Sequence, residues 1–275
     1  MIQLRLLAGL AVVVFAGGCG SQSSNTPAPI GPVPSTATVD AASGDVLIGE
    51  RRDARTRAAA HTELAGAYFE RGDMAVALDE VRVALQADSD YGPAHNLMGL
   101  IQMDLKQNAA AQSSFERALR IDPRDSDANH NMGRFLCQTG RAEDGIKYFM
   151  VAVQNPLYRT LAKTYTAAGA CYERSGSPAE ALEMYERALR NDGKYSPAML
   201  PYARLQMARG GLNEARSAVQ QFNTVNQPTP ESLWLQLRIE HRRGDSQSEE
   251  AAGAQLKRRF PDSREYRQYQ RGEFE

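Results

Sequence analysis

The sequence predicts an all-α protein built from about six helix-turn-helix repeats, and three observations carry this prediction. Small and large apolar residues alternate at helical spacing in paired segments, most clearly over residues 94–123. The same arrangement returns about every 34 residues through most of the chain. Glycines or short polar runs separate the two segments of each pair. An ordinary helical bundle with irregular helix lengths would not keep this register, so we expect a solenoid whose units pack against their neighbours.

The clearest copy of the repeat occupies residues 94–123. Gly99 and Ala111 are small enough to let two antiparallel helices approach closely, and Phe115 fills the space beside that contact. Pro123 ends the second helix, because proline has no N–H to donate and disfavours helix in the residue before it. The position of Gly99 then recurs in steps of 34 residues, with a single step of 36. The recurring residues are Ala65, Gly99, Gly133, Gly169, Ala203 and, in a degenerate sixth copy, Leu237.

Residues 1–18 are predicted to be an export signal. Arg5 supplies a positive charge, and the apolar run Leu6–Ala16 is too short to span a bilayer, which takes about 20 residues. Ala16-Gly-Gly-Cys19 resembles a bacterial lipobox, which implies that Cys19 becomes the lipidated N-terminus. In a Gram-negative bacterium, Gly20 after this cysteine would suit outer-membrane sorting. The usual box has leucine in place of Ala16, so cleavage as an ordinary secreted protein is the alternative.

Residues 19–50 are predicted to be the lipidated cysteine followed by a disordered tether rich in proline and serine. From Gly20 to about Asp45 the chain has no helical period and few large apolar residues. Such a segment cannot bury enough surface to offset the entropy of ordering. For Val46-Leu47-Ile48 two alternatives remain, docking on the first repeat or staying mobile.

The repeat domain is predicted at residues 51–265, with a C-terminal tail at 266–275. The first helix of each repeat is called helix A. The helices A are expected at Asp53–Arg71, Tyr91–Leu105, Ser126–Thr139, Tyr158–Ser175, Pro197–Arg209 and Pro230–Arg243. The second helices, helices B, are expected at Met74–Ala87, Asn108–Ile121, Ala142–Gln154, Pro178–Asn191, Leu212–Thr224 and Ser246–Phe260. Glycines mark most A-to-B turns because glycine tolerates left-handed backbone.

Two residues beyond the period stand between repeats three and four, within Gln154–Tyr158. We expect this insertion to end the helix before it and to tilt repeat four against repeat three. It is either a plain surface loop or a joint that shapes a groove for a partner.

Composition and motifs argue against catalysis. The 275 residues are 42% hydrophobic and 24% charged, as in ordinary globular chains, and the net charge of −1 gives no support for nucleic-acid binding. The chain has no G-x-S-x-G, phosphate-binding glycine loop, H-E-x-x-H or paired C-x-x-C. We therefore expect no enzymatic activity, no cofactor and no metal. His95 and His130 lie on adjacent helices A, where ordinary polar roles are favoured over a metal pair.

Cys137 and Cys171 lie 34 residues apart on neighbouring helices A. An exported protein can form disulfides. However, their positions within the repeat differ by two, which predicts side chains that point in different directions. Buried free thiols that act as small hydrophobic groups are therefore the favoured interpretation.

The repeat pattern resembles the tetratricopeptide repeat, so the fold class is a tetratricopeptide repeat superhelix. The resemblance implies that helices A line a concave, peptide-binding face, on which the fifth, ninth and twelfth positions of each unit point inward. The groove predicted on this basis consists of Thr62, Gly66, Phe69, Asn96, Leu100, Met103, His130 and Arg134. The alternative is that these side chains only pack against the next repeat. The Lys/Asn pattern of a carboxylate clamp is missing, so we do not expect recognition of a C-terminal carboxylate.

The whole mature chain resembles the type IV pilus biogenesis/stability lipoproteins, the PilF/PilW-type pilotins. The segments that carry the resemblance are Tyr91–Asn96, Asn129–Cys137, Arg141–Gly145, Asn155–Tyr158, Phe260–Ser263 and Gly272–Glu275. The family implies a lipid-anchored protein of the outer membrane that faces the periplasm. It implies binding of secretin subunits, their delivery to the outer membrane and their assembly into multimers. We expect a monomer apart from this partner. The alternative is a scaffold or regulator of another periplasmic assembly, in cell-wall synthesis or outer-membrane assembly.

Overall fold

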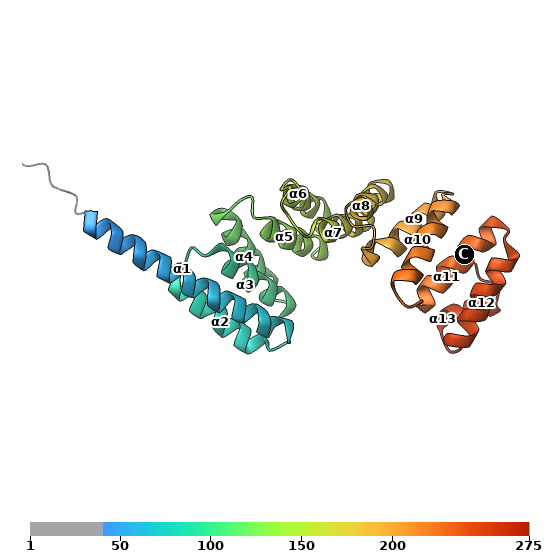
Figure 1. Cartoon of the computed structure of the whole chain (residues 1–275), viewed down its shortest axis with the longest axis horizontal. Coiled ribbons are helices and arrows are strands. Elements are labelled where there is room, and N and C mark those ends of the chain that lie inside the picture. The colour runs from blue at the N-terminus through green and yellow to red at the C-terminus, as the bar shows by residue number, and fades with distance from the viewer. Residues whose placement is uncertain (1–40, 275) are drawn as a thin grey trace, which may run out of the picture. The chain divides into compact units, whose positions relative to one another are not determined.

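The computed structural model describes residues 41–274, and this part of the chain contains thirteen helices and no strand (Figure 1). The helices are α1 (Ala41–Glu70), α2 (Met74–Ala87), α3 (Gly92–Asp104), α4 (Asn108–Ile121), α5 (Ser126–Gln138), α6 (Ala142–Ala152), α7 (Leu161–Arg174), α8 (Pro178–Asn191), α9 (Ser196–Ala208), α10 (Leu212–Val225), α11 (Pro230–Arg243), α12 (Ser246–Arg259) and α13 (Arg264–Gln270). The predicted signal, Cys19 and most of the predicted tether lie outside the described residues. The chain divides into two units, Met1–Val46 and Leu47–Glu275, and the second holds nearly all of the described residues.

The first twelve helices form six consecutive A/B pairs, which confirms the predicted all-α repeat fold. In the second, third and fourth pairs the two helices approach closely at the recurring glycine. A Cβ atom on Gly99 would lie 2.6 Å from the ring of Phe115, and one on Gly169 would lie 2.8 Å from Tyr185. Only glycine therefore fits these positions, because a real side chain cannot come this near an aromatic ring. The aromatic residue follows its glycine by sixteen positions in both pairs.

The core consists of clusters that neighbouring repeats share. One cluster joins Met103 and Phe115 of the second pair to Met132, Phe135 and Leu136 of the third. Because each unit buries its apolar surface against the next, the order of the repeats along the chain sets the order of the contacts.

The first helix is longer than predicted. It begins at Ala41 rather than Asp53, so residues 41–50 of the predicted tether are helical. This stretch contains no proline and is followed by charged residues that favour helix. From Gly49 onward, its first fully buried residue is Ala58, and the residues from Arg51 to Arg57 are mostly exposed.

The two-residue insertion does end the preceding helix, as predicted, because α6 stops at Ala152 and α7 begins only at Leu161. Its turn is braced by hydrogen bonds. The Asn155 Oδ1 accepts from the backbone N–H of Leu157 at 3.0 Å, and the Tyr158 hydroxyl donates to Asp127 Oδ1 at 3.0 Å. The Leu157 side chain is left 86% exposed.

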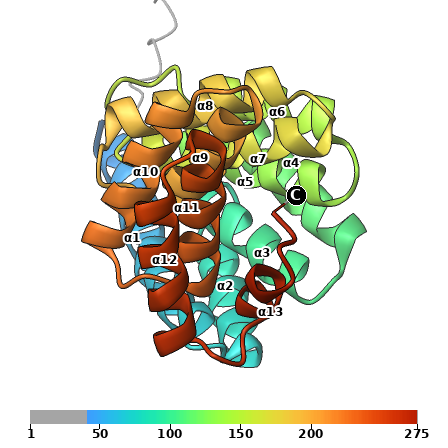
Figure 2. The same ribbon diagram turned by 90° about the vertical axis from the view of Figure 1, so that its right-hand side faces the viewer.

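The predicted tail is not a free end. Residues 264–270 form α13, which packs on α11 and α12 (Figure 2). Ser263 caps this helix by accepting a hydrogen bond from the backbone of Tyr266. Gly272 then adopts a left-handed conformation with φ of +67°, which turns the last residues back toward α11.

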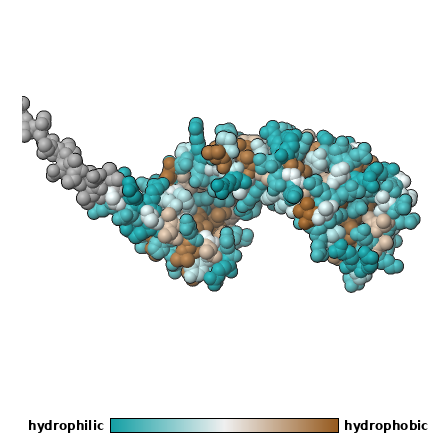
Figure 3. All heavy atoms as spheres, viewed as in Figure 1, coloured by the Kyte–Doolittle hydropathy of each residue, from teal (hydrophilic) through white to brown (hydrophobic). Residues whose placement is uncertain are grey.

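The surface seen in Figure 3 is mostly hydrophilic, with separate hydrophobic patches. Among residues 41–274, no helix combines the length and the apolar character needed to cross a membrane.

Candidate partner-binding surface on the helices A

The predicted groove residues lie on three helices A, namely α1, α3 and α5, but they differ in exposure. Six of them are partly exposed, namely Thr62, Gly66, Phe69, Asn96, Leu100 and Arg134. Met103 and His130 are only 6% and 2% exposed. Of the eight residues predicted to line the groove, only these six are therefore accessible to a partner.

Met103 belongs to the core. It packs in one cluster with Phe115 of the same repeat and Phe135 of the next. The prediction that it lines an open surface is wrong, because α5 covers it. Met103 instead packs against the next repeat, which was the alternative to a groove position.

His130 is also a structural residue. Its Nδ1 lies 2.8 Å from the Thr164 hydroxyl, its ring meets Phe149 edge to face, and its Nε2 has no hydrogen-bond partner within the described residues. Burial, together with the positive charges of Lys163 and Arg134, lowers the pKa of His130 to about 3. The neutral ring therefore links α5 to α7. The prediction that His130 lines the partner-binding groove is wrong, because the side chain is buried.

The remaining groove residues still form a mixed surface. The Thr62 hydroxyl donates to the Ala58 carbonyl at 2.7 Å, and Asn96 Oδ1 accepts from Asn131 Nδ2 at 3.1 Å, so both polar groups are occupied. Phe69 and Leu100 pack only partly against their core clusters. They are the apolar groups that this face offers for contact with an apolar segment.

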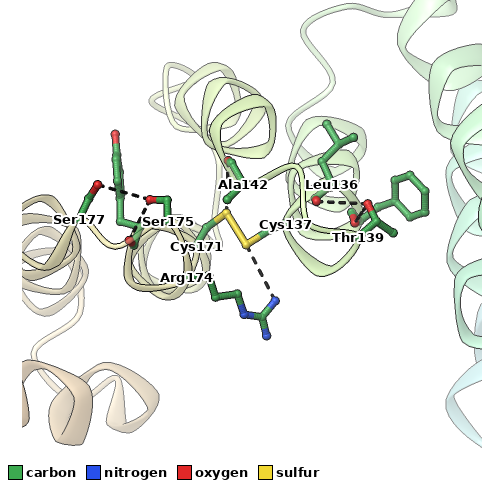
Figure 4. The surroundings of a disulfide bond; sticks show 10 residues. Leu136, Cys137, Thr139, Ala142, Cys171, Arg174, Ser175 and Ser177 are labelled. Carbon is green, nitrogen blue, oxygen red and sulfur yellow. Dashed lines mark hydrogen bonds between the residues drawn. A yellow bond between two sulfur atoms is a disulfide. The ribbon is translucent and has the colours of Figure 1, made fainter.

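The two cysteines form a disulfide that joins α5 to α7, with Cα atoms 5.7 Å apart (Figure 4). The prediction of free thiols is wrong, and the reason is geometric. Two repeat positions correspond to a rotation of roughly 200° about the helix axis, which turns the side chains of Cys137 and Cys171 toward each other across the interface. The pair His130 and Thr164 has the same separation of 34 residues, two helical turns earlier. The separation of 34 residues between Cys137 and Cys171, combined with the rotation per residue of a helix, is the signal in the sequence that could have predicted the disulfide.

Further polar contacts tie the later helices A together. Glu173 on α7 accepts from Arg204 on α9 at 2.5 Å and from the Tyr185 hydroxyl at 2.6 Å. Burial and the Glu173 carboxylate raise the pKa of Tyr185, which keeps its hydroxyl a donor. On the next helix A, Arg242 of α11 donates to the Met207 carbonyl of α9. A partner would therefore meet a pre-organised surface, which lowers the entropy cost of binding.

A partly apolar pocket lies mainly against the helices B of the second and third repeats, outside the predicted groove. It has a volume of about 430 Å³ and is lined by residues of α4, α5 and α6. Leu119, Tyr148 and Val151 contribute apolar surface. The charged side chains are of both signs, namely Glu116, Arg141, Asp144 and Lys147. No sequence motif marks this pocket, because it forms between helices of two consecutive repeats.

The sixth repeat was also left out of the groove prediction. In the register that places Asn96, Leu100 and Met103 inward, the corresponding residues of α11 are Trp234, Arg238 and His241. In the described residues, no group of three or more His, Cys, Asp or Glu side chains is placed to hold a metal ion.

Comparison with known proteins agrees with this architecture. Residues 92–125, 124–194 and 173–234 match family models described as tetratricopeptide repeat, which is a protein-interaction fold. The chain is 26% identical over 211 residues to the type IV pilus assembly protein PilF of Pseudomonas aeruginosa, covering 77% of this chain and 84% of PilF.

Two solved structures are similar over nearly their whole length. PilW, described as a widely conserved type IV pilus biogenesis factor, has 28% identity and a TM-score of 0.67 over 77% of this chain and 97% of its own. The structure of Pseudomonas aeruginosa PilF has 26% identity and a TM-score of 0.72 over 81% and 99%. The chain is thus homologous to PilF and PilW, and it belongs to the tetratricopeptide repeat family.

Proposed function

We propose that the protein is an outer-membrane lipoprotein pilotin for type IV pilus biogenesis. In this role it binds subunits of the secretin through the partly exposed residues of its first three helices A. The lipid on Cys19 then brings the subunits to the outer membrane, where they assemble into multimers. The observation that carries the proposal is the similarity to PilF and PilW, which extends over most of this chain and nearly all of the two solved structures.

The physics of such a carrier requires two binding functions and no chemistry. Lipid chains hold the protein at a membrane, since each buried methylene contributes about 0.8 kcal/mol and more than one chain gives stable anchoring. The repeat surface holds the partner. With both on one chain, the effective concentration of the partner at the membrane rises without any new contact.

The proposal is tested by deleting the gene and following the secretin. We expect the detergent-resistant multimer to disappear from the outer-membrane fraction, and the wild-type gene to restore it. A Cys19→Ala variant that is still exported should bind the secretin but fail to restore multimers in the outer membrane. Normal multimers in the deletion strain would reject the pilotin role, and full rescue by Cys19→Ala would reject only the lipid anchor.

A further inference from the structure

The last residues of the chain occupy a slot on α11. The Phe274 ring stacks on the His241 ring with centroids 3.9 Å apart and an interplanar angle of 8°. The Trp234 ring is also stacked with the Phe274 ring, with centroids 6.0 Å apart and an interplanar angle of 18°. The Arg238 Nε donates to the Phe274 carbonyl oxygen at 3.0 Å. An aromatic side chain and its own backbone carbonyl are therefore both recognised.

The residues of this slot are the inward positions of the last helix A. Trp234, Arg238 and His241 follow one another at spacings of four and three residues, so they share one face of α11. No further helix A follows α11 among the described residues. The chain's own tail, instead of a neighbouring repeat, covers this face.

Two arginines of α11 lie near the slot. Arg238 and Arg242 both lie on α11, and burial together with the charge of Arg242 lowers the pKa of Arg238. In the sequence, Phe274 stands between Glu273 and Glu275. The Glu273 carboxylate pairs with Arg271 of the tail at 2.8 Å, and Arg242 donates to the Met207 carbonyl. The slot on α11 therefore recognises the phenylalanine ring and the backbone carbonyl of the same residue.

We propose that Trp234, Arg238 and His241 form a peptide-binding site that the tail occupies in cis. Its ligand in trans is an extended segment of a partner protein that presents a phenylalanine ring and the backbone carbonyl of the same residue, and this segment displaces the tail. Only three residues connect α13 to Phe274, and α13 is itself packed on α11 and α12. Exchange of tails between two copies would require α13 to unpack, so a partner segment is favoured over a second copy.

The full-length Phe274→Ala variant tests the site, because it leaves the slot open. The probe is a fluorescein-labelled peptide with the tail's own sequence, Arg-Gly-Glu-Phe-Glu, followed by anisotropy. We expect the variant to bind at least about tenfold more tightly than the wild type, because the tail competes for the slot in the wild type. The peptide with alanine in place of phenylalanine should not bind. Adding Arg238→Met to the variant should weaken binding, whereas adding Arg258→Met, on the exposed end of α12, should not.

A second measurement uses the wild-type chain and does not depend on the variant being folded. Trp234 is the only tryptophan, so a peptide with 4-bromophenylalanine, at millimolar concentration, should quench its emission when it enters the slot. Equal affinity for wild type and Phe274→Ala, or binding of the alanine peptide, would overturn the proposal. A wild-type dimer in sedimentation that Phe274→Ala abolishes would also overturn it, by assigning the tail to a second copy.

Discussion

His130 shows how burial of one side chain links stability to pH. Its pKa falls from 6.5 to about 3 in the folded protein, chiefly because the charged ring would lose its hydration. In the unfolded chain the His130 imidazole binds a proton below pH 6.5, whereas in the folded chain it binds a proton only near pH 3. The stabilisation is therefore complete above pH 6.5 and is lost as the pH falls toward 3.

We predict that this residue makes the protein less stable in mild acid. The loss is about 1.4 kcal/mol for each pH unit, or about 2 kcal/mol between pH 6.5 and pH 5. Urea unfolding of the wild type and of His130→Gln at pH 7.5 and pH 5 measures it, and His130→Gln should have the smaller pH dependence. His95→Gln is the matched control, since His95 only contacts the Ser89 carbonyl near the surface. If the free energy of unfolding changed equally with pH in the wild type and in His130→Gln, the acid sensitivity would not come from His130.

The surface residues of the proposed groove can be tested one by one. We predict that Phe69→Glu or Leu100→Glu weakens secretin binding by roughly tenfold, the effect of losing about 1.4 kcal/mol. Met103 is unsuitable because a buried charge there would unfold the repeat. Tyr148→Glu, in the pocket on the helices B, is the control that should bind normally. Titration of each purified variant with a secretin fragment, after circular dichroism confirms its helicity, decides between the two faces. Loss of binding in Tyr148→Glu alone would move the interface to the helices B.

At the scale of the helix pair, glycine decides how closely helices A and B approach. A Cβ atom on Gly133 would lie 2.9 Å from both the Gly145 carbonyl oxygen and the Phe149 ring, so backbone as well as side chain would have to move. In α1, by contrast, a Cβ atom on Gly66 would have nothing within 4 Å.

The two glycines should therefore respond in opposite directions to the same substitution. Gly133→Ala is predicted to destabilise the protein by about 1–3 kcal/mol through overpacking. Gly66→Ala is predicted to stabilise it by about 0.5–1 kcal/mol, because alanine favours helix over glycine. Thermal and urea unfolding of the two variants provides the comparison. A neutral Gly133→Ala would show that α5 and α6 can separate at little cost.

For the whole molecule, stability should vary along the chain, because each repeat contacts mainly its neighbours. The disulfide closes a loop of 34 residues between α5 and α7, which on the chain-entropy model contributes about 3–4 kcal/mol. The middle repeats therefore have a covalent constraint that the terminal helices lack.

Hydrogen exchange measured by mass spectrometry should show this gradient. We predict the slowest exchange in α5 and α7, and the fastest at the start of α1 and in α13. Reduction by dithiothreitol should speed exchange in α5 and α7 most, in a Cys19→Ser background that removes the third thiol. If reduction left these two helices unchanged, packing rather than the disulfide would hold the middle repeats.

The sequence by itself determined the features that depend on local spacing and size. Gly99, Phe115 and their counterparts predict the helix pairs because only a small residue permits the close approach that the aromatic ring then fills. The positions of most helices follow from proline and glycine in the same way. The insertion before α7 also follows, because an added pair of residues must break the period.

Only the tertiary structure decided which inward positions remain open. Met103 and His130 are buried because the next helix A packs against each of them. The disulfide forms because the orientation of α7 about its axis turns Cys171 toward Cys137 on α5. The C-terminal residues carry no helical period that predicts their place, yet the left-handed turn at Gly272 sets Phe274 on α11. These outcomes depend on the relative rotation of helices that are distant in sequence, which the local pattern of each helix does not contain.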